Sequence, residues 1–177
     1  MPAWFLASII LLFAAALISA CGGGGSGSGS STIAVKLATV AQPGQTPQAK
    51  GITVTLLLPQ GVTLRTVTGT RQTAPGVFRF SGAAPFANVT SQLFPRPLFG
   101  TYSAGSPGRN AVTLAFTSPV AFGAGEFATL SCEVPAGVTA PAASFQILDF
   151  HASGDSATQF ADDITAQFQA PTVTLVP

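Results

Sequence analysis

Apolar and polar residues alternate with a period of two along most of this chain, and Pro and Gly interrupt the alternation at short intervals. This period is typical of strands with one buried face, and the interruptions are typical of turns. The clearest examples are residues 33–37 and 52–58, and the same pattern predicts strands at 77–80, 89–93, 99–103, 112–116, 127–134, 145–151 and 173–176. Seven or more short strands at this spacing predict an all-β fold, a β-sandwich of the jelly-roll or immunoglobulin-like type.

One segment, residues 156–168, fits two patterns. Its first four residues match a capping box, and Phe160, Ile164 and Phe168 then recur at helical spacing. However, Ile164, Ala166 and Phe168 also alternate with polar residues, as they would in a strand. The sequence therefore leaves a short helix and a strand open here.

The first twenty residues show no alternation and are almost entirely apolar. The apolar run 3–20 lies at the lower edge of the length that crosses a bilayer as a helix. A permanent span usually carries Lys or Arg on its cytoplasmic flank, whereas the first basic residue of this chain is Lys36. Small residues stand immediately before Cys21, as a signal peptidase requires. We therefore expect residues 1–20 to be a cleaved signal peptide, with an uncleaved anchor as the alternative.

The residues Ile18-Ser19-Ala20-Cys21 resemble the bacterial lipobox, which is an aliphatic residue, two small residues and a Cys. The resemblance implies a lipoprotein in which Cys21 is the lipidation site and the first residue after processing. Attachment by more than one acyl chain is stable, at about 0.8 kcal/mol per buried methylene. In enteric bacteria, an Asp directly after the lipidated Cys resembles a signal for retention in the inner membrane. This chain has Gly22 at that position. The expected location is extracytoplasmic and lipid-anchored to the bacterial membrane, with the outer membrane or cell surface favoured.

Gly and Ser residues fill most of the segment 21–31 that links this Cys to the predicted strands. Such a tract is a flexible coil, and about 10 residues span roughly 17 Å at about 5 to 6 Å times the square root of the length. Residues 32–177 have the size of one ordinary domain with its own core. We therefore expect one sandwich domain, residues 32–177, on a flexible tether.

Charged residues are few and unevenly distributed. They make up 7% of the chain, every Lys and Arg precedes Glu126, and only acidic residues follow it. Because strands from both halves of a sandwich lie side by side, this segregation predicts cross-strand ion pairs. The alternative is a dipolar domain with one basic and one acidic face. The formal net charge of +1 does not favour binding to nucleic acid.

The sequence carries no motif that indicates catalysis. Cys132 has no cysteine partner once Cys21 is acylated, and the alternation places it on the buried face of its strand, which predicts an inert thiol. His151, the only histidine, stands two residues from Asp149, so we expect a side-by-side surface pair and not a catalytic triad. We expect no enzyme, no catalytic residues and no cofactor.

Asp149 and Asp155 are the candidates for a metal site. With the neighbouring acids they could supply hard oxygen ligands to a calcium ion in a loop. No EF-hand or other ordered ligand pattern is present, and ordinary loop acids are the alternative interpretation. We therefore expect no metal.

A Phe- and Pro-rich stretch supplies the candidate partner-binding residues. Phe86, Phe94, Arg96 and Phe99 lie among prolines that break continuous strand pairing. The three rings could close one end of the sandwich or form an apolar patch for a protein partner. Both interpretations stay open at this point.

The order of the segments 33–37, 51–56, 58–64 and 125–130, with a Pro-Gly turn after the first, resembles a bacterial cohesin-like domain. The resemblance implies a nine-stranded jelly-roll related to certain carbohydrate-binding modules. With the anchor and the tether, it favours a binding or scaffolding module of the cell envelope that mediates protein–protein interaction or adhesion. Polysaccharide binding is the alternative. It is less favoured because sugar platforms use polar-tipped aromatic rings, whereas Trp4 lies in the signal peptide and Tyr102 is the only tyrosine.

Overall fold

The computed structural model describes residues 29–84, 100–104, 109–155 and 162–176. Within these ranges the chain forms eight strands and two short 3₁₀ helices. The elements are β1 (Ser31–Thr39), β2 (Ala49–Leu57), β3 (Phe78–Phe80), β4 (Gly100–Ala104), β5 (Asn110–Phe122), β6 (Gly125–Val134), η2 (Ala142–Ser144), β7 (Gln146–Gly154), η3 (Thr165–Gln167) and β8 (Thr172–Val176). No helix of these ranges is long and apolar enough to cross a membrane.

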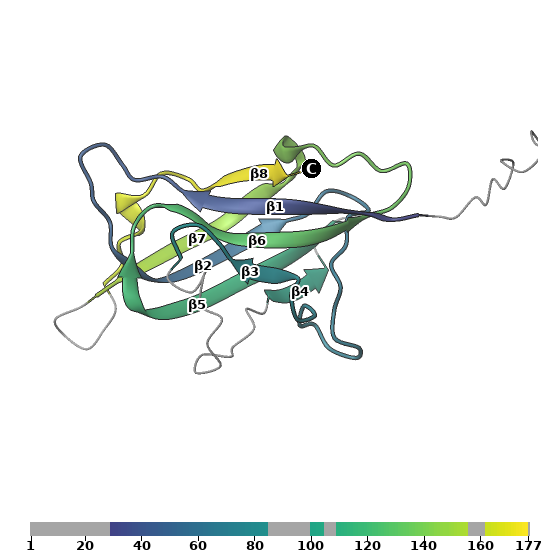
Figure 1. Ribbon diagram of the computed structural model, residues 1–177, viewed down its shortest axis with the longest axis horizontal. Coiled ribbons are helices and arrows are strands. Elements are labelled where there is room, and N and C mark those ends of the chain that lie inside the picture. The colour runs from purple at the N-terminus through teal and green to yellow at the C-terminus, as the bar shows by residue number, and fades with distance from the viewer. Residues whose placement is uncertain (1–28, 85–99, 105–108, 156–161, 177) are drawn as a thin grey trace, which may run out of the picture.

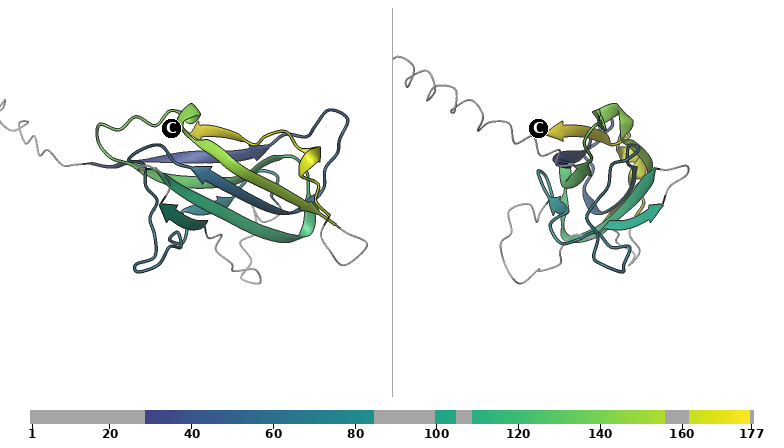
Figure 2. Two further views of the ribbon diagram at one scale, coloured as in Figure 1. Left: turned by 180° about the vertical axis from the view of Figure 1, so that it is seen from behind. Right: turned by 90° about the vertical axis from the view of Figure 1, so that its right-hand side faces the viewer.

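The strands form two four-stranded sheets packed face to face (Figure 1). One sheet has the order β3-β6-β1-β8 and the other the order β4-β5-β2-β7, and the pairings within both sheets are antiparallel. The end-on view in Figure 2 shows the two layers. The predicted all-β sandwich is therefore confirmed.

The core lies between the two sheets, and the period-two alternation explains which side chains enter it. On β6, Ala128, Leu130, Cys132 and Val134 point inward and are buried, as the sequence predicted for the face that carries Cys132. β1 and β2 contribute their own alternate residues to the same layer, among them Val35, Leu37, Ile52, Val54 and Leu56. Burial of each such side chain contributes about 1.5–3 kcal/mol.

The strand positions agree closely with the alternation in the residues that the structure describes. The described residues contain eight strands, and the nine strands that the cohesin-like resemblance implies stay a prediction for the whole chain. The predicted strand 89–93 lies outside the described residues. In the segment 156–168, the described part is neither an α-helix nor a continuous strand, because Asp163 makes an isolated bridge to Ser153 and η3 follows.

The sandwich has two distinct ends. Ser31 opens β1 opposite Val134, and at the same end β2 finishes and β7 begins. The Gly/Ser tract precedes Ser31 in the sequence, so we call this the tether end. The opposite end, which we call the distal end, carries the loop between β1 and β2 and the turn between β5 and β6 (Figure 1).

Residues 162–168, the closing segment, cover the distal half of the β7 edge. The Gly154 N–H donates to the Asp162 carbonyl at 2.8 Å, and the Ala152 N–H donates to the Thr165 hydroxyl at 2.9 Å. Phe168 then enters the gap between the sheets and meets Phe150 edge to face, with ring centroids 5.9 Å apart. The segment therefore provides hydrogen-bond partners for the backbone of the β7 edge, and its Phe168 side chain closes the gap between the sheets.

Three ion pairs join bases of the first half of the chain to acids of the second half. Lys36 Nζ lies 2.9 Å from Glu126 Oε2, Lys50 Nζ lies 2.6 Å from Asp155 Oδ2, and Arg65 Nε lies 3.8 Å from Glu133 Oε1. Lys36 and Glu126 stand on the neighbouring strands β1 and β6. This pair is the cross-strand ion pair that the segregation predicted, whereas the other two pairs involve Asp155 and Arg65, which lie outside the strands.

Candidate functional site

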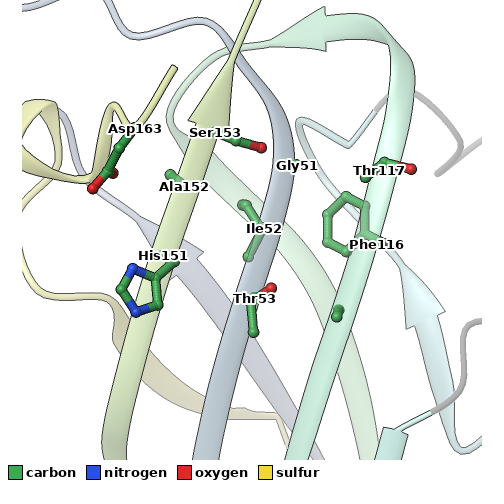
Figure 3. Close-up of a pocket in the computed structure, with 10 residues that line it drawn as sticks. Gly51, Ile52, Thr53, Phe116, Thr117, His151, Ala152, Ser153 and Asp163 are labelled. Atoms are coloured by element: carbon green, nitrogen blue, oxygen red, sulfur yellow. The ribbon is translucent and has the colours of Figure 1, made fainter. Parts of the chain in front are cut away.

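A shallow hollow of about 510 Å³ lies on the outer face of β5, β2 and β7, toward the distal end (Figure 3). We call it the distal hollow. Its lining comes from the three strands and the closing segment: Gly51, Ile52, Thr53, Ala115, Phe116, Thr117, His151, Ala152, Ser153 and Asp163.

The hollow exists because a glycine stands where three strands run side by side. Gly51 of β2 is registered between Thr117 of β5 and Ser153 of β7. A Cβ at Gly51 would come too close to the Ser153 hydroxyl unless that hydroxyl rotated away. The backbone of Gly51, which carries no side chain, therefore forms the floor of the hollow. The hydroxyl groups of Thr117 and Ser153 form two of its walls.

One rim of the distal hollow carries an imidazole between two carboxylates. His151 Nε2 lies 3.3 Å from Asp149 Oδ1, and the two side chains are 65% and 53% exposed. This is the side-by-side surface pair that the two-residue spacing predicted. His151 and Asp163 lie on the same side of β7 in Figure 3.

The Asp163 carboxylate is held in its charged form. Hydrogen bonds from the Thr165 side chain, and then from the Thr165 backbone, lower the pKa of Asp163, and the nearby His151 adds a smaller effect in the same direction. The backbone bond runs from the Thr165 N–H to Asp163 Oδ1 at 2.9 Å. The rim therefore presents the charged Asp163 carboxylate close to the His151 side chain.

This arrangement suits hydrogen bonding and ion pairing with a bound surface. Within the described ranges, no hydrogen bond joins His151 to a Ser or Thr hydroxyl, which a nucleophilic triad would need. The Phe116 ring packs inward against Phe80, Phe122 and Phe127, with centroids 4.9, 5.8 and 6.3 Å apart. The hollow therefore offers hydroxyl, imidazole and carboxylate groups but no flat aromatic platform.

The calcium candidates Asp149 and Asp155 stand apart on β7 and just beyond it. Asp149 contacts His151, and Asp155 pairs with Lys50. Among the residues that the structure describes, no three His, Cys, Asp or Glu side chains group closely enough to hold a metal ion. The two acids serve as partners of neighbouring bases.

The other predicted site residues have different outcomes. Cys21, Phe86, Phe94, Arg96 and Phe99 lie outside the described residues. Cys132 is fully buried, and desolvation raises its thiol pKa to about 12, which suits the inert role predicted for it.

Tyr102 lies on β4, outside the distal hollow. It is half-buried, and burial raises its pKa against the opposing effect of a hydrogen bond with Asn110. The only tyrosine of the chain thus contributes nothing to this hollow.

Sequence reasoning missed Gly51, Thr53, Thr117 and Ser153, and it considered Asp163 only among the neighbouring acids of a possible calcium loop. One signal was available, because an isolated glycine within a strand pattern indicates a close approach of neighbouring groups. The grouping itself depends on strand register, which the spacing along the chain does not reveal. The chain matches no protein-family profile, no curated protein and no solved structure.

Proposed function

We propose that this protein is a lipid-anchored binding module of the bacterial envelope that mediates protein–protein interaction or adhesion through the distal hollow. Cys21 would carry the acyl chains, and the tract 22–31 would act as the tether. The β-sandwich supports this proposal, and so does the resemblance of its sequence segments to a cohesin-like domain. The observation that carries it is that the distal hollow lies toward the end of the sandwich opposite the tether end.

The tether end and the distal hollow lie toward opposite ends of the sandwich. β1 runs from Ser31 at the tether end to Thr39 at the distal end, and at about 3.3 Å per residue this strand is about 30 Å long. The tether would add roughly 17 Å. A domain held by its first strand would therefore present Gly51, Thr117 and Ser153 away from the membrane.

The polar character of the hollow favours a protein partner over a polysaccharide. Hydroxyl, imidazole and carboxylate groups can exchange hydrogen bonds and ion pairs with a protein surface. Sugar platforms instead depend on exposed aromatic rings with polar tips, which the lining lacks. Polysaccharide binding is kept as the second candidate because of the cohesin-like resemblance.

The lipid anchor is tested by replacing Cys21, the residue that would carry the acyl chains. Cys21→Ser should abolish acylation, so that the protein moves from the membrane fraction to the soluble fraction and intact mass loses the diacylglyceryl group. Mass spectrometry and fractionation of the two proteins provide the measurement. An unmodified Cys21 in the unaltered protein would refute the anchor while leaving the binding proposal to its own test.

The binding surface is tested by filling the hollow. Gly51→Ala should weaken binding to the envelope partner about tenfold, which is about 1.4 kcal/mol. Stability should change by less than about 1 kcal/mol, because the preference of a strand interior for alanine over glycine offsets the rotation of the Ser153 hydroxyl that the new Cβ requires. Partners are identified by photo-crosslinking from Thr117, and their affinity is then measured with purified proteins.

Gly123→Ala is the matched control, since a Cβ there meets no other atom within 4 Å and Gly123 does not line the hollow. It should leave the affinity unchanged. Crosslinking from Thr174, which is exposed on β8 of the other sheet, should yield no adduct with the same partner. Equal crosslinking from both positions would refute the assignment of the surface. Retardation by a polysaccharide in affinity electrophoresis, sensitive to Gly51→Ala, would select the second candidate.

A further inference from the structure

A second hollow, of about 790 Å³, lies at the tether end, and we call it the tether-end hollow. Its walls come from the segment after β2, the start of β5 and the stretch between β6 and β7. Among the described residues, none that lines it is acidic. The lining residues are Pro59, Gln60, Gly61, Arg109, Val138, Thr139, Ser144 and Gln146. The hollow therefore holds one positive charge and no negative charge from its own lining.

Three hydrogen bonds fix the Arg109 guanidinium in this hollow. Its Nε–H donates to the Leu58 carbonyl at 2.9 Å, and Nη2 donates to the Ser144 carbonyl at 2.7 Å. Nη1 donates to Gln146 Oε1 at 3.3 Å. All three acceptors are neutral, so the charge is positioned but not neutralised.

The guanidinium keeps donors in reserve. It has five N–H groups in a planar fork, and the three bonds occupy three of them. The Gln146 side chain accepts through its oxygen, so its amide N–H groups remain as donors. Gln60 and Thr139 add exposed polar side chains to the same lining. These groups form a set of donors around a fixed cation.

Arg109 differs in this respect from the bases that form ion pairs. Lys36, Lys50 and Arg65 each have a carboxylate within 4 Å. Arg109 makes no ion pair with any acid of the residues that the structure describes. A pre-positioned arginine fork without a carboxylate matches the geometry of a phosphate group.

We propose that the tether-end hollow binds a phosphate group through Arg109, either from a soluble phosphorylated ligand or from a lipid headgroup. Charge-assisted hydrogen bonds from the free N–H donors would hold two of its oxygens. The phosphate site itself is independent of the anchor. The lipid source alone rests on the proposed function, because lipid anchoring would hold this end of the domain near the membrane surface.

The site is tested by titrating the full chain, carrying Cys21→Ser, with inorganic phosphate. The ¹⁵N–¹H signal of Arg109 Nε should shift in a saturable manner, with a dissociation constant on the order of 1 mM. Use of this variant makes the result independent of lipidation. Absence of a saturable shift would overturn the proposal.

Gln60→Glu places a carboxylate in the hollow while Arg109 keeps its three bonds, so phosphate affinity should fall at least tenfold. Gln45→Glu is the matched control, because Gln45 is exposed in the loop between β1 and β2 and the change in net charge is identical. It should alter the affinity by less than twofold. Equal losses in the two variants would show a general charge effect and refute the site.

The two sources are distinguished by competition. Vesicles of phosphatidylglycerol should compete with inorganic phosphate if the ligand is a headgroup, whereas vesicles of a neutral glycolipid without phosphate should not. Competition by the first vesicle alone supports a lipid ligand. Phosphate binding unaffected by either vesicle supports a soluble ligand, and competition by both vesicles contradicts recognition of phosphate in a lipid.

Discussion

The two ends of the sandwich are closed by different physical means. At the distal end, Phe168 of the closing segment is buried with only 5% of its surface exposed and packs against Phe150. At the tether end, Arg109 ties the Leu58 and Ser144 carbonyls together across an open hollow. An apolar plug contributes through the area it buries, while a cation bound to carbonyls contributes through hydrogen bonds and leaves donors in reserve. The first closure suits stability, and the second also suits ligand binding.

The largest effect is expected at the apolar plug. Phe168→Ala should lower the free energy of unfolding by about 3–5 kcal/mol, because it leaves a cavity between the sheets. Chemical denaturation provides the measurement. Hydrogen exchange at the Ala152 and Gly154 amides should accelerate as the closing segment loosens. Val120→Ala, at a side chain that is 59% exposed, should change stability by less than about 0.5 kcal/mol. Similar losses in both variants would contradict the role of the plug.

A smaller loss is expected at the polar closure. Arg109→Met keeps a long apolar side chain but removes the three hydrogen bonds, and should lower the free energy of unfolding by about 2 kcal/mol. Arg79→Met is the control, since Arg79 is exposed on β3 and should cost less than about 0.5 kcal/mol. Thermal and chemical denaturation of the pair check the difference. A loss at Arg109 no greater than at Arg79 would show that the tether end is held by other contacts.

The smallest effect is expected in the pH dependence of the free energy of unfolding, through Glu126. A hydrogen bond from Ser81, followed by the contributions of Lys36 and Thr129, lowers the pKa of Glu126. Because the folded pKa lies below the unfolded value of about 4.3, the stabilisation is present above that pH and is lost as pH falls through the folded pKa. Glu126→Gln should therefore cost about 0.5–1 kcal/mol at neutral pH and less at a pH below the unfolded value. Denaturation curves at both pH values test this, and a constant difference would contradict it.

The pKa of Asp163 is also lowered, so its contribution to stability is likewise lost as the pH falls. Both acids lie toward the distal end, whereas the hydrogen bonds of Arg109 involve no titrating acceptor. Acid should therefore raise hydrogen exchange around Gly125 and Thr165 before it does so around Leu58 and Ser144. The opposite order would overturn the contrast between the two ends.

The sequence predicted those features that depend on neighbours within a few residues. The strands follow from alternation, and the contact between His151 and Asp149 follows from a two-residue spacing on one strand face. The distal hollow was not predictable in this way, because Gly51, Thr117 and Ser153 meet only through the register of three strands. A shift of one residue would turn the same side chains toward the core.

The sequence pattern did not predict the long-range polar contacts either. Arg109 binds carbonyl groups 51 and 35 residues away in the chain, and carbonyls carry no sequence signature because every residue has one. The closing segment was ambiguous since Phe168 is its single buried residue among those described, so neither a period of two nor a helical period governs its packing. A short 3₁₀ helix and two isolated bridges, Asp163 with Ser153 and Phe168 with Ala41, are enough to place that ring.

The covered edge of β7 has a consequence for how copies of this protein meet one another. Free N–H and C=O groups on an outer strand can template a neighbour's backbone and begin fibrillar aggregation. Here the Ala152 carbonyl and the Gly154 amide are already bonded within the chain. Wherever copies become concentrated, residues 162–164 must peel away before this half of the strand can recruit another molecule.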